Sequence, residues 1–100
     1  KVPPMKAVLV YHNKELLDNG DIAEIKIWKV PVTLDKPHGF KYSLVFIHND
    51  KRVIDYDNAE QKGDHLHIGN KELKYRFKSI SRLFEDFKKD IMKFRKGELL

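Results

Sequence analysis

Residues 79–97 carry the pattern that most constrains the fold. Apolar side chains recur there at offsets of three, four, seven and eleven residues, which places them along one side of an α-helix. This apolar stripe comprises Ile80, Leu83, Phe84, Phe87, Ile91 and Phe94. Ser79 is suited to cap the first turn, and Gly97 is suited to end the helix. A single amphipathic helix cannot bury its stripe alone, so the rest of the chain must supply a surface that covers it.

The segments before this helix are typical of β-strands. β-Branched and aromatic residues dominate six runs, which are separated by turns rich in Gly, Pro, Asn and Asp. The predicted strands are residues 7–12, 22–30, 40–48, 52–57, 64–68 and 73–77. Neighbouring runs joined by short turns pair as antiparallel hairpins. The sequence therefore predicts an α+β fold, in which an antiparallel sheet of about five to six strands packs one long C-terminal helix on one face.

Composition and net charge limit the functions that the chain can have. The 100 residues suit one domain, which we place at residues 5–97, with residues 1–4 as an N-terminal extension or tag remnant. Cysteine is absent, which excludes disulfides and thiolate chemistry and fits a reducing cytoplasm. The net charge of +5 suits a polyanionic partner such as RNA. No apolar run reaches the roughly 20 residues that span a membrane, and no signal peptide is visible, so we expect a cytoplasmic protein without membrane contact.

The densest group of titratable side chains lies in residues 56–69, which read YDNAEQKGDHLHIG. In a strand, His65 and His67 project from one face, and Leu66 projects from the other. If the helix covers the Leu66 side, both imidazoles lie on the open face of the sheet. Side chains of neighbouring strands, such as those of Tyr56 and Asp57 or of Tyr75, would then join them.

Three kinds of chemistry fit this group of side chains. Metal-independent RNA cleavage needs a base for the 2′-hydroxyl, an acid for the leaving 5′-oxygen and cations for the phosphorane, and histidine can fill either proton role. Alternatively, the His-x-His pair with Asp57 or Asp64 forms a metal site. The third possibility is phosphate binding without chemistry. Two outward polar residues of an edge strand are the structural alternative, because His-x-His by itself is a weak signal.

Several separate motifs occur together along the chain. They are residues 5–11 (MKAVLVY), 25–28 (IKIW), 38–42 (HGFKY), 56–58 (YDN), 62–67 (KGDHLH), 75–77 (YRF) and 86–87 (DF). In this order they resemble the TumE family of small prokaryotic toxins from type II toxin–antitoxin pairs. The resemblance implies a toxin that is silenced by a cognate antitoxin with a helix-turn-helix domain, and either a homodimer or a hetero-oligomer with that antitoxin. Leu66 departs from this pattern, because a polar residue, often arginine, is expected there.

We therefore predict a toxin that acts on RNA as a small metal-independent ribonuclease and needs no cofactor. His65 and His67 are predicted to transfer protons, with Tyr56 and Asp64 beside them and Asp57 as the orienting group. The residues predicted to bind phosphate and nucleic acid are Lys62, Arg76, Tyr75 and Lys41. The alternatives are a non-catalytic module that binds antitoxin or nucleic acid, and a His/Asp metal-dependent enzyme. The chain has no Gly-rich phosphate motif, which excludes the classical nucleotide-cofactor enzymes.

Overall fold

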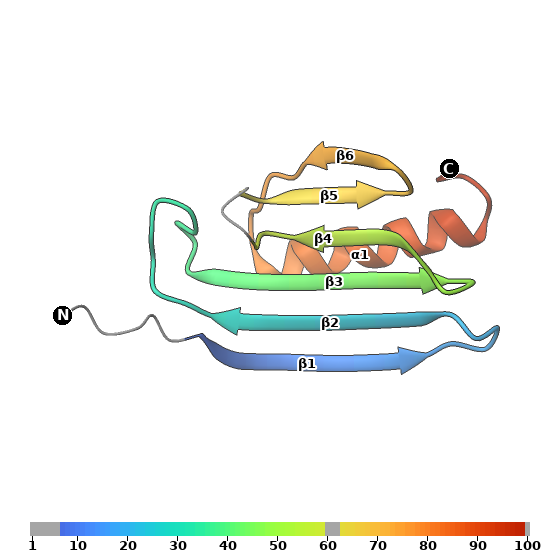
Figure 1. The fold of residues 1–100 in the computed structure, drawn as a ribbon, viewed down its shortest axis with the longest axis horizontal. Coiled ribbons are helices and arrows are strands. Elements are labelled where there is room, and N and C mark those ends of the chain that lie inside the picture. Colours follow the sequence, from blue (N-terminus) through green and yellow to red (C-terminus); the bar gives the residue numbers. More distant parts are fainter. Residues whose placement is uncertain (1–6, 60–62, 100) are drawn as a thin grey trace.

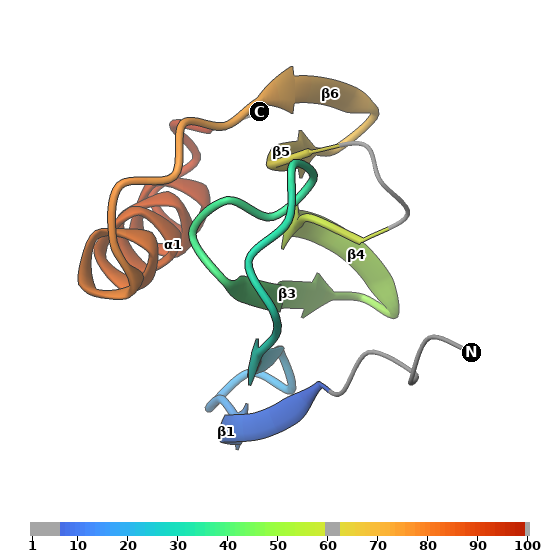
Figure 2. The same ribbon diagram turned by 90° about the vertical axis from the view of Figure 1, so that its left-hand side faces the viewer.

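The computed structural model describes residues 7–59 and 63–99. The elements are β1 (Val8–Leu16), β2 (Ile22–Lys29), β3 (Phe40–His48), β4 (Lys51–Asp57), β5 (His65–Ile68), β6 (Lys71–Lys74) and α1 (Ile80–Arg95). The six strands form one antiparallel sheet in sequence order, and α1 lies along one face of it (Figure 1 and Figure 2). The predicted α+β fold is confirmed.

The ends of α1 lie where the sequence places them. The Ser79 hydroxyl accepts the N–H of Arg82 at 3.0 Å, which satisfies one donor of the first turn. Gly97 follows the last turn with a φ of +75°, a conformation that glycine adopts without the steric cost of a Cβ. In the part of the chain that the structure describes, no helix is long and apolar enough to cross a membrane.

Two strands differ from their predicted boundaries by more than one residue. β1 continues past His12 to Leu16, because its pairing with β2 runs on to the hairpin turn at the Leu16–Ile22 pair. β6 occupies residues 71–74 rather than 73–77, because the turn after Ile68 is tight and pairing with β5 resumes at once. The chain then leaves the sheet, although the Tyr75 N–H still donates to the Asp64 carbonyl at 3.2 Å.

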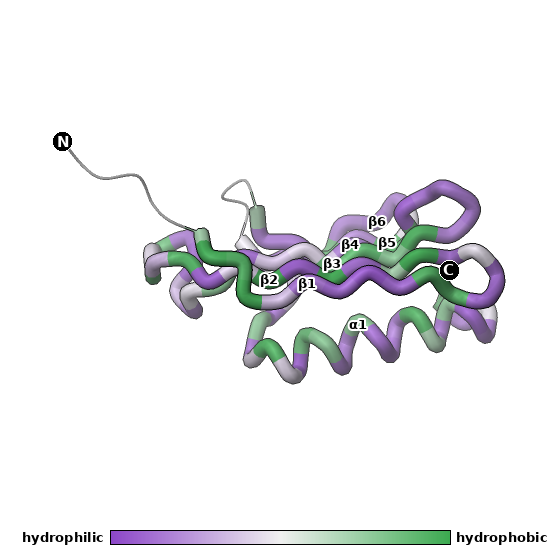
Figure 3. The backbone as a smooth tube through the Cα atoms, turned by 90° about the horizontal axis from the view of Figure 1, so that it is seen from below, coloured by the Kyte–Doolittle hydropathy of each residue, from purple (hydrophilic) through white to green (hydrophobic). Residues whose placement is uncertain are grey.

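The core lies between α1 and the face of the sheet that it covers (Figure 3). Side chains alternate along each strand, so one set from β2 to β5 faces the helix and the other set faces away. The buried helix-side set comprises Ile25, Ile27, Tyr42, Leu44, Phe46, Ile54, Tyr56 and Leu66, and α1 adds Leu83 and Phe87. The face without a helix is called the open face below. This division between faces positions the candidate site.

Candidate functional site

The two histidines of β5 share the open face of the sheet. Leu66 between them belongs to the core, so the strand period turns His65 and His67 away from the helix. Their rings meet edge to face, with centroids 5.2 Å apart. His65 is only 7% exposed, whereas His67 is half-buried. Both rings therefore face the same side of the sheet, and His67 is the more exposed of the two.

The two rings differ in their polar neighbours. His65 Nδ1 lies 3.0 Å from the Gly63 carbonyl oxygen. A carbonyl only accepts hydrogen bonds, so Nδ1 carries the proton, and Nε2 of the neutral ring keeps its lone pair. His67 Nε2 lies 3.3 Å from a carboxylate oxygen of Glu72 on β6, close enough for an ion pair when the imidazole is protonated. The two rings therefore have different polar neighbours, a backbone carbonyl for His65 and a carboxylate for His67.

Carboxylates of β4 border the histidine pair. The strand register sets Asp57 opposite His65 and Asp55 opposite His67. The Asp57 carboxylate accepts the Ala59 N–H at 2.7 Å, which fixes its position after the strand ends. Burial raises the pKa of the Asp55 carboxyl, and repulsion from Asp57 raises it further. The structure thus brings Asp57, the predicted orienting group, to the strand position beside His65.

Tyr56 and Tyr75 lie on the helix side, away from both histidines. The Tyr56 hydroxyl donates to Asp90 at 2.5 Å, and the Tyr75 hydroxyl donates to Asp86 at 2.6 Å. Burial, together with these carboxylates, raises the pKa of both phenols, so they remain neutral donors. Tyr56 adjoins Asp57 in sequence and therefore projects from the opposite face of β4. The structure does not bring either tyrosine to the histidine pair.

Asp64 forms a second polar cluster at the same end of the sheet. Its Oδ1 accepts the Tyr42 hydroxyl at 2.7 Å and lies 3.1 Å from His38 Nε2. The Phe40 N–H donates to His38 Nδ1 at 3.2 Å, so Nδ1 is unprotonated and the proton of the neutral ring resides on Nε2. His38 therefore donates to Asp64, and its ring packs on Phe77 at 4.0 Å between centroids. Two donors hold the Asp64 carboxylate in place.

A shallow hollow of about 520 Å³ adjoins this cluster. It is lined by Asp64, Lys74, Tyr75, Arg76 and Phe77. Lys74 stands opposite His65 in the pairing of β5 with β6, so one residue of this lining occupies the strand position beside His65. Lys74 and Arg76 are exposed, and within residues 7–59 and 63–99 no carboxylate forms a salt bridge with either. Both cations are available to an anion.

Comparison with models of protein families assigns the chain to a family. The family model described as toxin TumE matches residues 6–95, most of the sequence. The chain belongs to the TumE toxin family. Searches of curated proteins and of solved structures found no match. As a TumE toxin, the protein is the toxin of a toxin–antitoxin system and has an antitoxin as its partner.

The other predicted cations of this TumE toxin lie farther from the histidines or outside the described residues. Lys41 is on the open face of β3, where its Nζ lies 5.0 Å from the centroid of the Trp28 ring. Lys62 falls in the segment that the structure does not describe. Across residues 7–59 and 63–99, no group of three or more His, Asp and Glu side chains is placed to hold a metal ion.

Sequence reasoning missed the cluster of His38, Tyr42 and Asp64. His38 lies in the loop before β3, 26 residues from Asp64, and nothing in the local pattern links the two. The available signal was the pair of TumE-like motifs, residues 38–42 and 62–67, which the structure brings into contact through this cluster. Two of the motifs that support the TumE resemblance therefore also contact each other in the folded protein.

Proposed function

We propose that this TumE toxin cleaves RNA in the cytoplasm as a metal-independent ribonuclease, and that an antitoxin with a helix-turn-helix domain neutralises it. The observation that carries the proposal is the adjacent histidine pair, in which the Gly63 carbonyl leaves Nε2 of His65 with its lone pair and His67 lies beside the Glu72 carboxylate. One ring is set up to take a proton and the other to give one. The net charge of +5 favours the approach of a polyanion.

The reaction requires that one proton be removed and another supplied. His65 Nε2 takes the proton of a 2′-hydroxyl while the 2′-oxygen forms a bond to the adjacent phosphorus. The bond from phosphorus to the 5′-oxygen breaks, and that oxygen takes a proton from Nδ1 of the charged His67. The products are a 2′,3′-cyclic phosphate and a 5′-hydroxyl. Afterwards His65 is protonated and His67 is neutral, and exchange with water restores the starting state.

The hollow beside Asp64 supports the binding half of this proposal. Lys74 and Arg76 flank it without salt-bridge partners among the described residues, so they can stabilise the charge that builds on the phosphate oxygens. The Asp64 carboxylate, held by two donors, is suited to accept a hydrogen bond from a ribose hydroxyl or a base amino group. Lys41 extends the cationic surface along the open face towards β2.

The test compares three histidine variants of the purified toxin. His65→Ala and His67→Ala remove the proposed base and acid. His12→Ala is the matched control, because His12 is exposed on the same face and its only side-chain partner among the described residues is Glu24, at 2.8 Å. Initial rates of RNA cleavage are measured with chelator present. We expect a loss of about 10²–10⁴-fold for each member of the pair and an unchanged rate for the control.

The chemical ends of the RNA fragments and the sugar of the substrate provide an independent check of the proposed reaction. We expect fragments that end in a 2′,3′-cyclic phosphate, and no cleavage of DNA or of RNA methylated at the 2′-oxygen, because the attacking atom is then absent or blocked. A His65→Ala/His67→Ala double variant that still cleaves RNA, or that still arrests growth when expressed without antitoxin, would refute the proposal.

A further inference from the structure

The helix-side face of the sheet is wider than α1. Six strands spaced about 4.8 Å apart span roughly 24 Å, whereas a helix with its side chains is about 10 Å across. α1 packs over β3 and β4, where Phe94 contacts Phe46 and Phe87 contacts Tyr56. Seen end-on, β1 lies well to one side of the helix (Figure 2). α1 therefore leaves part of the helix-side face uncovered over β1 and β2.

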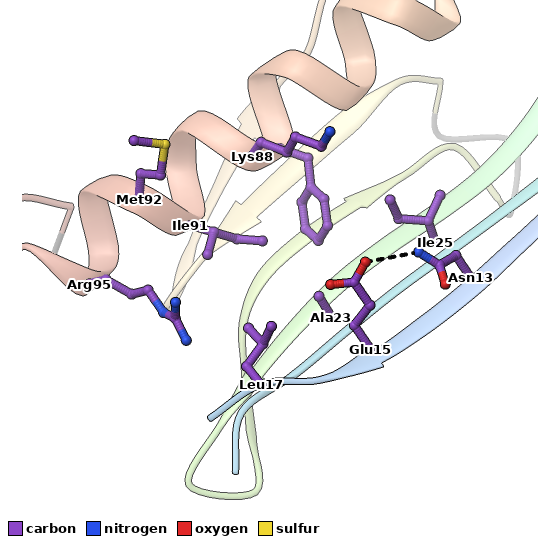
Figure 4. Close-up of a pocket in the computed structure, with 10 residues that line it drawn as sticks. Asn13, Glu15, Leu17, Ala23, Ile25, Lys88, Ile91, Met92 and Arg95 are labelled. Atoms are coloured by element: carbon purple, nitrogen blue, oxygen red, sulfur yellow. Dashed lines mark hydrogen bonds between the residues drawn. The ribbon is translucent and has the colours of Figure 1, made fainter. Parts of the chain in front are cut away.

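A groove of about 300 Å³ lies in this space, between α1 and the first two strands (Figure 4). Its apolar lining comprises Leu17, Ala23, Ile25, Phe87, Ile91 and Met92. Met92 is 58% exposed, which is unusual for a large apolar side chain beside a core. Tyr11 continues the same surface along β1, where it is 41% exposed and contacts Phe84 at 5.3 Å between ring centroids. Among residues 7–59 and 63–99, no further side chain covers this apolar surface.

Two cations border the groove on its helix side. Lys88 and Arg95 are seven residues apart, which is two helical turns, so they lie on one flank of α1 (Figure 4). Neither forms a salt bridge with a carboxylate in the part of the chain that the structure describes. Glu15 borders the opposite, strand side and accepts a hydrogen bond from the Asn13 amide at 3.1 Å. A partner bound in the groove would therefore form favourable contacts through acidic side chains only on the side that faces α1.

We propose that the cognate antitoxin fills this groove with an amphipathic helix packed beside α1 on β1 and β2. Its apolar stripe covers Ile91 and Met92, and two carboxylates seven residues apart pair with Lys88 and Arg95. A helix fits better than a strand added to the edge of β1, because only a second layer covers an apolar floor that lies on the face of the sheet. The inference rests on the antitoxin partnership of TumE toxins and not on the ribonuclease chemistry.

The position of the groove has a functional consequence. The groove and the His65/His67 pair lie on opposite faces of the sheet, so this antitoxin helix anchors the complex without touching the histidines. Loss of the anchor should weaken the complex and leave the activity of the free toxin intact. Measuring antitoxin affinity and the activity of the free toxin therefore distinguishes a role in antitoxin binding from a role in RNA cleavage.

The test uses two double charge reversals on α1. Lys88→Glu/Arg95→Glu alters the groove, and Lys89→Glu/Lys93→Glu makes the same charge change at exposed positions that do not line it. Each toxin is titrated by calorimetry with the antitoxin encoded beside it. We expect the groove variant to bind about tenfold or more weakly and the control within about twofold of the native toxin, because two ion pairs become repulsive contacts. All variants should melt at similar temperatures and cleave RNA at the native rate.

Three results would overturn the inference. The first is equal antitoxin affinity for both double variants. The second is hydrogen-exchange protection by the antitoxin along the outer edge of β1 with none at α1, which would indicate strand addition. The third is a toxin that dimerises through the groove, with a dimer that Met92→Asp dissociates, because the occupant would then be a second copy. Restored binding when the paired antitoxin carboxylates are changed to lysine would support it. Absent RNA cleavage by the native toxin would count against the proposed function alone.

Discussion

Asn58 extends the pairing of β3 with β4 through its side chain. Its Nδ2 donates to the Phe40 carbonyl at 2.8 Å, and its Oδ1 accepts the Tyr42 N–H at 3.0 Å. These bonds lie just beyond the last backbone pair, Ser43 with Asp57. Asn58 is only 1% exposed, so water does not compete for either partner. The side chain therefore holds the start of β3, including the tyrosine whose hydroxyl positions Asp64.

Asn58→Ala leaves the buried Tyr42 N–H and the partly buried Phe40 carbonyl without partners. Each unpaired group costs about 1–3 kcal/mol, and water entering the vacated space recovers part of that. We expect the free energy of unfolding to fall by about 3 kcal/mol and the melting temperature to fall by about 12–24 °C. Urea unfolding followed by tryptophan fluorescence measures the first quantity, and calorimetry measures the second.

Asn58→Asp tests the donor separately at nearly constant volume. The carboxylate keeps an acceptor for the Tyr42 N–H but sets a second oxygen against the Phe40 carbonyl, where only the protonated form can donate. Burial and this repulsion raise the folded-state pKa of the introduced carboxyl above its unfolded value of about 3.9. The variant should therefore approach native stability below about pH 4 and lose it as the pH rises through the folded-state pKa.

The exposed Asn70→Asp is the control and should change stability by less than about 0.5 kcal/mol at any pH. Two outcomes would refute the role assigned to Asn58. One is an Asn58→Ala variant within about 1 kcal/mol of the native protein. The other is an Asn58→Asp variant whose deficit is the same at pH 4 and pH 7.

Two further predictions concern side chains of β4. Tyr56→Phe removes the bond to Asp90, so we expect urea unfolding to show a loss of about 1–2 kcal/mol, whereas RNA cleavage stays at the native rate because the hydroxyl lies on the helix side. Slower cleavage by the folded variant would place Tyr56 in the catalytic site after all. Asp55→Asn removes a carboxyl whose pKa burial raises, so its urea midpoint should exceed the native one at pH 7, and the gain should shrink as the pH falls towards 4. An equal gain at both pH values would exclude the charge as its cause.

Local periodicity was sufficient for the helix and for most of the sheet. The apolar stripe from Ile80 to Phe94 and the cap at Ser79 predict α1, because both signals lie within the element itself. The second half of β1 was missed for a physical reason. Residues 13–16 read NKEL and lie on an edge strand that is mostly exposed, so burial imposes no apolar alternation on them. Backbone pairing with β2, which leaves no such pattern, holds them in the sheet.

The site divides into a part that the strand period predicts and a part that it does not. The alternation of side chains along a strand sets His65 and His67 on one face, and it also sets Tyr56 and Asp57 on opposite faces. Because Asp57 pairs with His65, the same alternation assigns Tyr56 to the core. The register between strands was the missing information. The bond from His38 to Asp64 joins a loop to the start of a strand, and no periodic rule applies there.

The motif KGDHLH therefore combines two functions within one short segment. Asp64 fastens the end of the sheet to the motif at residues 38–42, through the side chains of His38 and Tyr42. The side chains of His65 and His67 project from the same segment towards the open face, and the Gly63 carbonyl sets the tautomer of the His65 ring. An anchor directly beside the two histidines limits their movement relative to the sheet. That arrangement explains why so many titratable residues occur together in this segment: some of them position the others.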